Sequence, residues 1–143
     1  EEVLAPLVAI GSADLVIAFE PAEAARMLPY LAPTGVLVSA TTAIQPVTAA
    51  LSAEPYRSTD IVAHLEEIMN DGDEKRFFPI ADDSLIRRIG NRKALNTVLL
   101  ASALSLGHVP LSLDDLKEAI KVCVKPRFVD LNMAAIEVVE QGL

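Results

Sequence analysis

Residues 14–46 are the stretch that most constrains how this chain can fold. The run Leu15–Phe19 is continuously apolar, as expected of a parallel strand that is buried on both faces. Pro21 can occupy the first position of a helix, where an amide hydrogen is not needed. Apolar residues follow at helical spacing, and Pro33-Thr34-Gly35 predicts a turn into a second apolar strand that begins at Val36. The stretch therefore predicts a strand–helix–strand unit with a right-handed crossover.

The rest of the chain predicts one further strand and a series of helices. Residues 75–81 predict a third strand at an edge of the sheet, because Pro79 cannot donate a ladder hydrogen bond. Helical spacing and capping residues predict five more helices: from Ser58-Thr59-Asp60 to Gly72, from Asp82 or Asp83 to Ile89, from Arg92 to Leu106, from a Ser112–Asp115 capping box towards Cys123, and from about Arg127 onward. The predicted fold class is α/β, a three-layer Rossmann-like domain with a short, mainly parallel sheet and a helical C-terminal flank.

Composition narrows the class of protein. The 143 residues fit a single domain, and no apolar run approaches the roughly 20 residues that cross a membrane as a helix. Glu1-Glu2 is acidic, whereas a signal peptide begins with basic residues, so no signal peptide is predicted at this start. A net charge of −8 disfavours nucleic acid and anionic membranes as partners. Cys123 is the only cysteine, which predicts a cytoplasmic location and no iron–sulfur cluster on this chain alone, since a cluster needs four ligands.

Polar side chains follow the first two predicted strands. Glu20 comes after the first strand, and Thr41 and Thr42 come after the second. Ligands of open α/β sheets bind beyond the carboxyl ends of the strands, so these residues are candidates for a binding site. The alternative is local structure: threonines favour turns, and Glu20 before a proline favours a helix start.

The only dense basic cluster comprises Arg87, Arg88, Arg92 and Lys93. It could contact a phosphate group or an acidic partner, and the alternative is that these side chains are simply solvated. Asn96 lies close to the apolar face of its predicted helix, where an amide needs a hydrogen-bond partner. That partner is either a neighbouring backbone group or a ligand or partner chain.

Other chemically suggestive residues have ordinary interpretations. His64 has no neighbouring His or Cys in the sequence and is expected at the surface, so no metal site is predicted. Cys123 lies on an apolar stripe and is expected in the core. Asp71-Gly72-Asp73 is interpreted as a solvated turn. The sequence contains no P-loop, no G-x-G-x-x-G motif and no thiamine motif. Neither histidine has the context of a Ser–His–Asp triad, so no catalytic residue is predicted.

The sequence also resembles a known family, the gamma-type domain of 2-oxoacid:ferredoxin oxidoreductases, and within it most resembles the beta subunit of indolepyruvate ferredoxin oxidoreductases. The matching residues of the first half are Ala13-Asp14, Glu20, Glu23-Ala24, Leu28-Pro29-Tyr30-Leu31, Gly35 and Ile44-Gln45-Pro46. Those of the second half are Gly90-Asn91, Ala94, Asn96, Val98-Leu99-Leu100, Pro110-Leu111, Leu116, Ala119-Ile120, Lys125-Pro126-Arg127-Phe128-Val129 and Asn132. The order and spacing of these blocks carry the resemblance.

The resemblance implies a single gamma-type domain over residues 1–143 that belongs to a larger complex. Such complexes oxidatively decarboxylate 2-oxoacids, here indolepyruvate or another arylpyruvate, form acyl-coenzyme A and reduce ferredoxin. It implies that a partner subunit carries the thiamine diphosphate and the iron–sulfur clusters. Two features depart from the family: the Gly-rich strand–turn–helix that begins its domain is missing, and Ala40 stands where Asn is common.

If coenzyme A approaches this domain, we expect it at the strand-end rim of Glu20, Thr41 and Thr42, with the basic segment Arg87–Lys93, and Arg92 and Lys93 above all, meeting its phosphates. A homo-oligomer is compatible with these expectations. Two alternatives stay open on the residues alone: a non-catalytic α/β interaction or regulatory domain of the same fold, and an independent small-molecule-binding enzyme.

Overall fold

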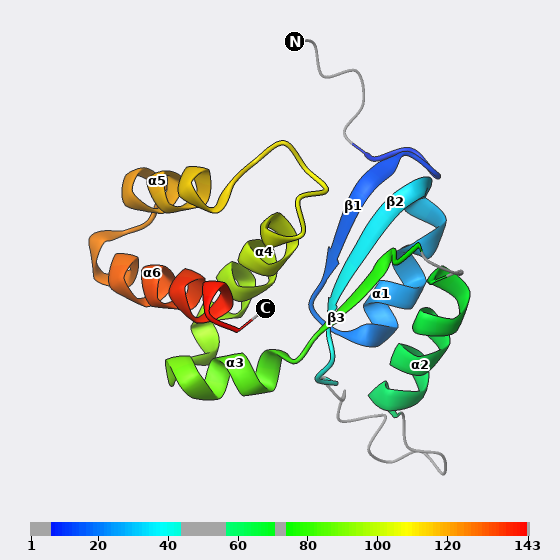
Figure 1. Cartoon of the computed structure of the whole chain (residues 1–143), viewed down its shortest axis with the longest axis horizontal. Helices are drawn as coiled ribbons and strands as arrows, with labels where there is room; N and C mark the ends of the chain where they lie inside the picture. The colour runs from blue at the N-terminus through cyan, green and yellow to red at the C-terminus, as the bar shows by residue number, and fades with distance from the viewer. Residues whose placement is uncertain (1–6, 44–56, 71–73, 143) are drawn as a thin grey trace.

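A computed structural model describes residues 7–43, 57–70 and 74–142 of the chain, and Figure 1 shows how its elements are arranged. Three parallel strands form a sheet in the order β1-β2-β3. Their bounds are Ala13–Ala18 for β1, Leu31–Ala40 for β2 and Phe77–Ile80 for β3. The strand–helix–strand prediction is confirmed, and so is the edge position of the third strand.

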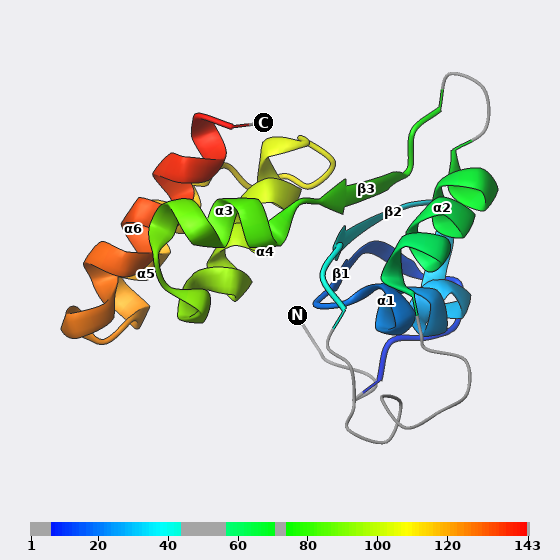
Figure 2. The same ribbon diagram turned by 90° about the horizontal axis from the view of Figure 1, so that it is seen from below.

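Helices lie on both sides of this sheet (Figures 1 and 2). One side carries α1 (Pro21–Met27), the short 3₁₀ helix η1 (Leu28–Tyr30) and α2 (Ser58–Met69). The other side carries α3 (Asp82–Ile89), the 3₁₀ helix η3 (Arg92–Ala94), α4 (Leu95–Ser105), α5 (Leu113–Cys123) and α6 (Pro126–Glu140). The α/β class and the helical C-terminal flank are confirmed.

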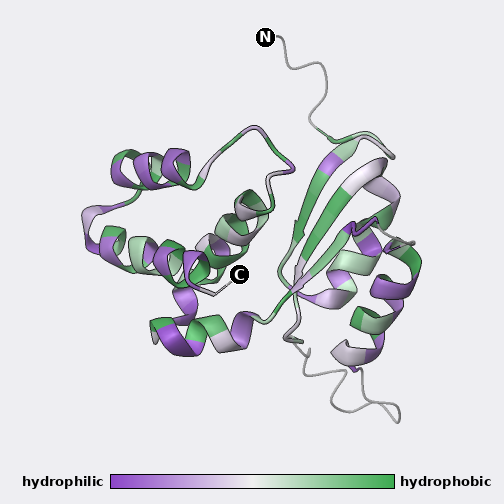
Figure 3. Cartoon of the chain, in the orientation of Figure 1, coloured by the Kyte–Doolittle hydropathy of each residue, from purple (hydrophilic) through white to green (hydrophobic). Residues whose placement is uncertain are grey.

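The two faces of the sheet belong to two hydrophobic clusters, because successive side chains of a strand point to opposite faces. Val36, Val38 and Ala40 of β2 face the helical flank, whose α4 packs on β1 and β2. Leu37 of β2 faces α1 and α2 and packs with the fully buried Leu65. Figure 3 shows the strands as mainly hydrophobic ribbons, as expected for a sheet covered on both faces.

The turn predicted at Pro33-Thr34-Gly35 is wrong, because β2 runs through these residues. They instead interrupt the ladder: Ala13 pairs with Leu31, but Leu15 pairs with Val36. A Cβ on Gly35 would lie 2.5 Å from the Ala13 carbonyl oxygen, so this close approach of the two strands requires glycine.

Several predicted helix ends are also corrected. Ser58 opens α2 and does not cap it, and Arg57 precedes the helix without a side-chain cap. Helix α2 ends at Met69, and the predicted Asp71-Gly72-Asp73 turn lies outside the described residues. By contrast, the Ser112–Asp115 capping box of α5 is confirmed.

Cys123 is exposed, so its predicted place in the core is wrong. It is the last residue of α5, whose final turn, residues 121–123, is exposed throughout. His64 is at the surface as predicted.

Candidate functional site at the strand ends

The carboxyl ends of the three strands meet at one edge of the sheet. Ala18 of β1 pairs with Ser39 of β2, which pairs with Pro79 of β3. Glu20 and Thr41 each follow two residues after these paired positions, so the structure brings the predicted residues to the same edge. This is the position at which open α/β sheets bind ligands.

Asp82, which the sequence predicts only as a possible helix cap, organises this edge. Asp82 opens α3 and is fully buried. Its Oδ1 accepts hydrogen bonds from the backbone N–H groups of Thr41 and Thr42, each at 3.0 Å. The Thr41 hydroxyl donates to the Ile80 carbonyl at 3.2 Å. We call Glu20, Thr41, Thr42 and Asp82 the strand-end rim.

This geometry changes what the rim can offer a ligand. Two consecutive amide groups at a strand end are an anion-binding arrangement, but here the Asp82 carboxylate already accepts from both. Among the described residues, the other oxygen of Asp82, Oδ2, is buried without a hydrogen-bond partner. The sequence signal that could have revealed Asp82 is its place directly after the third strand, where a side chain points back across the strand ends.

Glu20 also has a local structural role. Its Oε1 accepts from the Glu23 N–H at 3.1 Å, which caps α1. The interpretation of Glu20 as a helix start is therefore confirmed, because a side-chain oxygen at this position satisfies an amide that the helix leaves without a partner.

The four residues of the predicted basic cluster lie in different surroundings. Arg87 pairs with Asp83 on the same helix, and Arg88 donates to Gln141. Arg92 and Lys93 follow α3, whose eight residues place them about 12 Å along the helix from the rim. The structure thus does not bring Arg92 and Lys93 directly to the strand ends.

Lys93 instead belongs to a second region, together with Asn96. Asn91 caps η3 as predicted, since its Oδ1 accepts from the Lys93 N–H at 3.0 Å. Asn96 is exposed, in contrast to its predicted place beside the buried face, and its Oδ1 accepts from the Thr97 N–H at 3.0 Å. Both side chains line a hollow of about 290 Å³ against α6.

A larger hollow of about 620 Å³ lies at the open edge of β1. Apolar side chains dominate its lining, including Leu15 and Ile17 of the strand and Met27 of α1. Leu7 and Ile10, just before the strand, are 81% and 77% exposed and line the same hollow. In the described residues no strand pairs with this edge of β1, and an apolar surface beside such an edge is typical of an interaction site.

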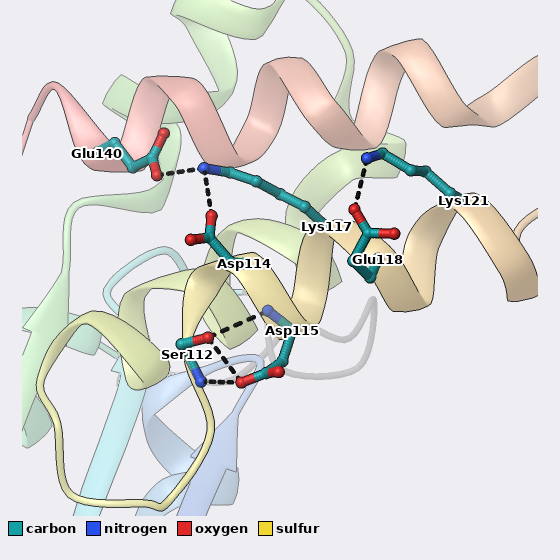
Figure 4. Close-up of polar contacts among 7 residues, drawn as sticks. All are labelled: Ser112, Asp114, Asp115, Lys117, Glu118, Lys121 and Glu140. Atoms are coloured by element: carbon teal, nitrogen blue, oxygen red, sulfur yellow. Dashed lines mark hydrogen bonds and ion pairs between the residues drawn. The ribbon is translucent and has the colours of Figure 1, made fainter.

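Charged side chains of α5 and α6 neutralise one another at the surface (Figure 4). The Lys117 ammonium lies 2.6 Å from the Glu140 carboxylate and 3.4 Å from that of Asp114. The hydrogen bond to Glu140 raises the pKa of Lys117. Bonds from the Ser112 hydroxyl and N–H lower the pKa of Asp115. The Lys117–Glu140 pair joins the two helices, and the other contacts lie within α5 and its N-cap.

The chain does not fit an iron–sulfur cluster, because its single cysteine cannot supply four thiolates. In the three described ranges, no group of three or more His, Cys, Asp or Glu side chains is placed to hold a metal ion. Nor is any helix of those ranges long and apolar enough to cross a membrane.

The fold and its strand-end rim define the chain as a three-layer α/β domain. Residues 1–140 match the family model for pyruvate ferredoxin/flavodoxin oxidoreductase, and the chain belongs to this family. It is 30% identical over 137 residues to the indolepyruvate oxidoreductase subunit IorB of Thermococcus kodakarensis, and likewise to that of Pyrococcus horikoshii. The IorB of Methanothermobacter thermautotrophicus is 31% identical over 135 residues. These matches cover 94–96% of this chain but only 66% of each relative, just under two thirds.

Proposed function

We infer that this chain is the non-cofactor-bearing subunit or domain of a 2-oxoacid:ferredoxin oxidoreductase in the cytoplasm. The family match over residues 1–140 carries the proposal, and the IorB relatives favour indolepyruvate or another arylpyruvate as the substrate. Because the chain has one cysteine, a partner subunit supplies the iron–sulfur clusters. The resemblance assigns the thiamine diphosphate to that partner as well. The chain supports oxidative decarboxylation to acyl-coenzyme A, with ferredoxin as electron acceptor, through its place in that complex.

The open edge of β1 supports the proposal that this domain is completed by further structure. The gamma-type domains that the chain resembles begin with a Gly-rich strand–turn–helix. A parallel strand at this edge would satisfy the backbone of β1, and its helix would cover the exposed Leu7 and Ile10. The apolar hollow beside Leu15 and Ile17 would then become part of the core.

Coenzyme A would approach between the rim and the basic pair. Asp82 already accepts from the amides of Thr41 and Thr42, so the phosphates would meet Arg92 and Lys93 and not those amides. The rim side chains Glu20, Thr41 and Thr42 would border the thiol-bearing end. Phosphate contacts of this kind are charge-assisted and favour exposed cations.

Affinity purification of the full-length protein from its own anaerobic lysate tests the complex. We expect a large cysteine-rich, thiamine-binding subunit to co-purify, identified by mass spectrometry, with arylpyruvate-dependent reduction of a viologen dye. A protein that purifies alone and inactive from an otherwise active lysate would contradict the proposal. That result would favour the alternative, a non-catalytic interaction or regulatory domain of the same fold.

Steady-state kinetics of the assembled complex test the role of the basic pair. Replacing Arg92 and Lys93 by Ala should raise the KM for coenzyme A about tenfold, since each lost charge-assisted contact weakens binding. The KM for the 2-oxoacid should not change. Replacement of Arg26 and Lys121 by Ala removes the same charge elsewhere and serves as the control. An unchanged KM for coenzyme A in the first variant would remove the basic pair from the proposal.

A further inference from the structure

The hollow that Lys93 lines has two chemically different sides. It opens where η3 and the start of α4 face α6, and η3 packs against α6. Its polar side is formed by Lys93, Asn96 and Asn132, and its apolar side by Val124, Phe128 and Leu131. Residues about thirty positions apart in the sequence thus meet around about 290 Å³ of space.

Hydrogen bonding within the hollow leaves donors available on its polar side. The Thr97 hydroxyl bonds to Asn132 Oδ1, and Asn132 Nδ2 donates to the Phe128 carbonyl at 2.7 Å. A carbonyl oxygen can only accept, which fixes the orientation of the Asn132 amide. Its Oδ1 is therefore occupied, and one N–H of its Nδ2 remains.

The side-chain oxygen of Asn96 is likewise occupied by a hydrogen bond within the protein. Its Oδ1 accepts from the Thr97 N–H, so its Nδ2 is left as a donor of two hydrogens. Within the described ranges, neither this nitrogen nor the Lys93 ammonium has a hydrogen-bond acceptor among the protein side chains. The polar side of the hollow therefore presents donors, a pattern that selects an anionic group.

Local charge agrees with this pattern although the whole protein is acidic. Residues 91–97 and 124–132 contain four basic side chains and one acidic side chain, Asp130, a local charge of +3 in a chain of net charge −8. The basic residues are Arg92, Lys93, Lys125 and Arg127. In the described part of the chain none of the four forms an ion pair, in contrast to the lysines of Figure 4.

We propose that this hollow binds a small organic anion, with its carboxylate or phosphate at Lys93, Asn96 and Asn132 and its apolar part against Phe128 and Leu131. The guanidinium of Arg127 lies 4.7 Å from the centre of the Phe128 ring and adds positive charge at this side. The site shares Lys93 with the coenzyme A contact of the proposed function, on which the coenzyme A reading rests, and adds Asn96, Asn132 and an apolar wall; binding to the isolated chain does not require the complex. A free organic carboxylate and a phosphate of coenzyme A share the required chemistry.

Calorimetric titration of the purified full-length protein, without partner subunits, tests the site. The probes are phenylacetate, coenzyme A and 2-phenylethylammonium, which has a phenyl group like phenylacetate but carries the opposite charge. We expect an anionic probe to bind and to shift the side-chain NH₂ signals of Asn96 and Asn132 in NMR spectra. Phenylacetate binding would identify a carboxylate ligand, and binding of coenzyme A alone would identify a phosphate ligand.

Matched variants separate a specific site from general charge attraction. Lys93→Gln should weaken binding of the anionic probe about tenfold, because its charge-assisted contact to the anion is lost. Asn96→Ala should weaken it about threefold, and Lys121→Gln, which removes one charge elsewhere, should leave it unchanged. Absence of binding by both anions, equal loss in Lys93→Gln and Lys121→Gln, or equal binding of 2-phenylethylammonium would each overturn the proposal. Failure of these titrations leaves the proposed complex unaffected.

Discussion

The two faces of the sheet are covered in different ways. Helices α1 and α2, which are adjacent in sequence to the strands, cover one face with a small cluster around Leu37, Leu65 and Phe77. The other face meets the helical flank, and its larger cluster continues away from the sheet through α4 to α6. Figure 2 shows the flank extending well beyond the sheet that it contacts.

This difference separates two sources of stability. The stability of the α1–α2 side depends on close packing between the strands and the two helices that cover them. This layer is thin, because these helices pack mainly on the strands and on each other. The flank has its own core between helices and contacts the sheet mainly through α4. Asp82 lies at the junction, where its side chain bonds the end of β2 to the start of α3.

Shortening a buried side chain in the core of the flank should lower stability the most. Leu99 of α4 is fully buried in the larger cluster, so Leu99→Ala should lower the free energy of unfolding by about 4 kcal/mol. Leu65→Ala on the α2 side should cost about 3 kcal/mol, because this thinner layer can relax into the space. Leu100→Ala, at a partly exposed neighbour, is the control. Urea unfolding measures all three, and a larger loss for Leu65→Ala would reverse the comparison.

Removal of the junction carboxylate should come next. Asp82→Ala leaves the Thr42 amide without its buried acceptor and the Thr41 amide with the Ile80 carbonyl alone, at a cost of about 2 kcal/mol. Asp82→Asn retains a side-chain oxygen and should lose less. Asp83→Ala, which removes only an exposed ion pair with Arg87, should change stability by about 0.5 kcal/mol or less. Urea unfolding with equal losses for Asp82→Ala and Asp83→Ala would remove Asp82 from the junction role.

A methyl group at Gly35 tests the fit between β1 and β2. The new Cβ would lie 2.5 Å from the Ala13 carbonyl oxygen, so Gly35→Ala should cost about 2 kcal/mol as the strands separate. In Gly142→Ala, the nearest atom is the flexible end of Arg88, which can move away. Thermal unfolding should therefore show a clear fall in Tm for the first variant only. An unchanged Tm in Gly35→Ala would mean that the ladder tolerates the wider spacing.

The smallest effect concerns the surface of the flank. The Ser112 hydroxyl and N–H hold the pKa of Asp115 below its ordinary value. This stabilisation is complete above the unfolded-state pKa of about 3.8 and is lost as the pH falls through the lower folded-state pKa. In Ser112→Ala the pKa of Asp115 should rise, as measured by carboxyl ¹³C NMR titration. Ser58→Ala, at a helix start without a side-chain cap, should not change it; the same titration curve in both variants would contradict the assignment.

The candidate site could be predicted only in part from the sequence. Thr41 and Thr42 were placed correctly at a strand end, because the end of an apolar run marks where a parallel strand leaves the sheet. Asp82 was assigned only to its own helix, since sequence spacing does not show a contact across 41 positions. Lys93 and Asn132 were likewise separate, and only the packing of η3 on α6 brings them to one hollow.

The sequence by itself determined the strand–helix–strand unit, the edge position of β3 and the capping box of Ser112. Each depends on interactions between residues close in the chain, or on the missing amide hydrogen of Pro79. Tertiary structure alone decided that Gly35 is a close contact and not a turn, that Cys123 is exposed, and that Asp82 accepts from the end of β2. These outcomes depend on which distant surfaces pack together, because burial and side-chain partners are properties of the assembled layers and not of any single segment.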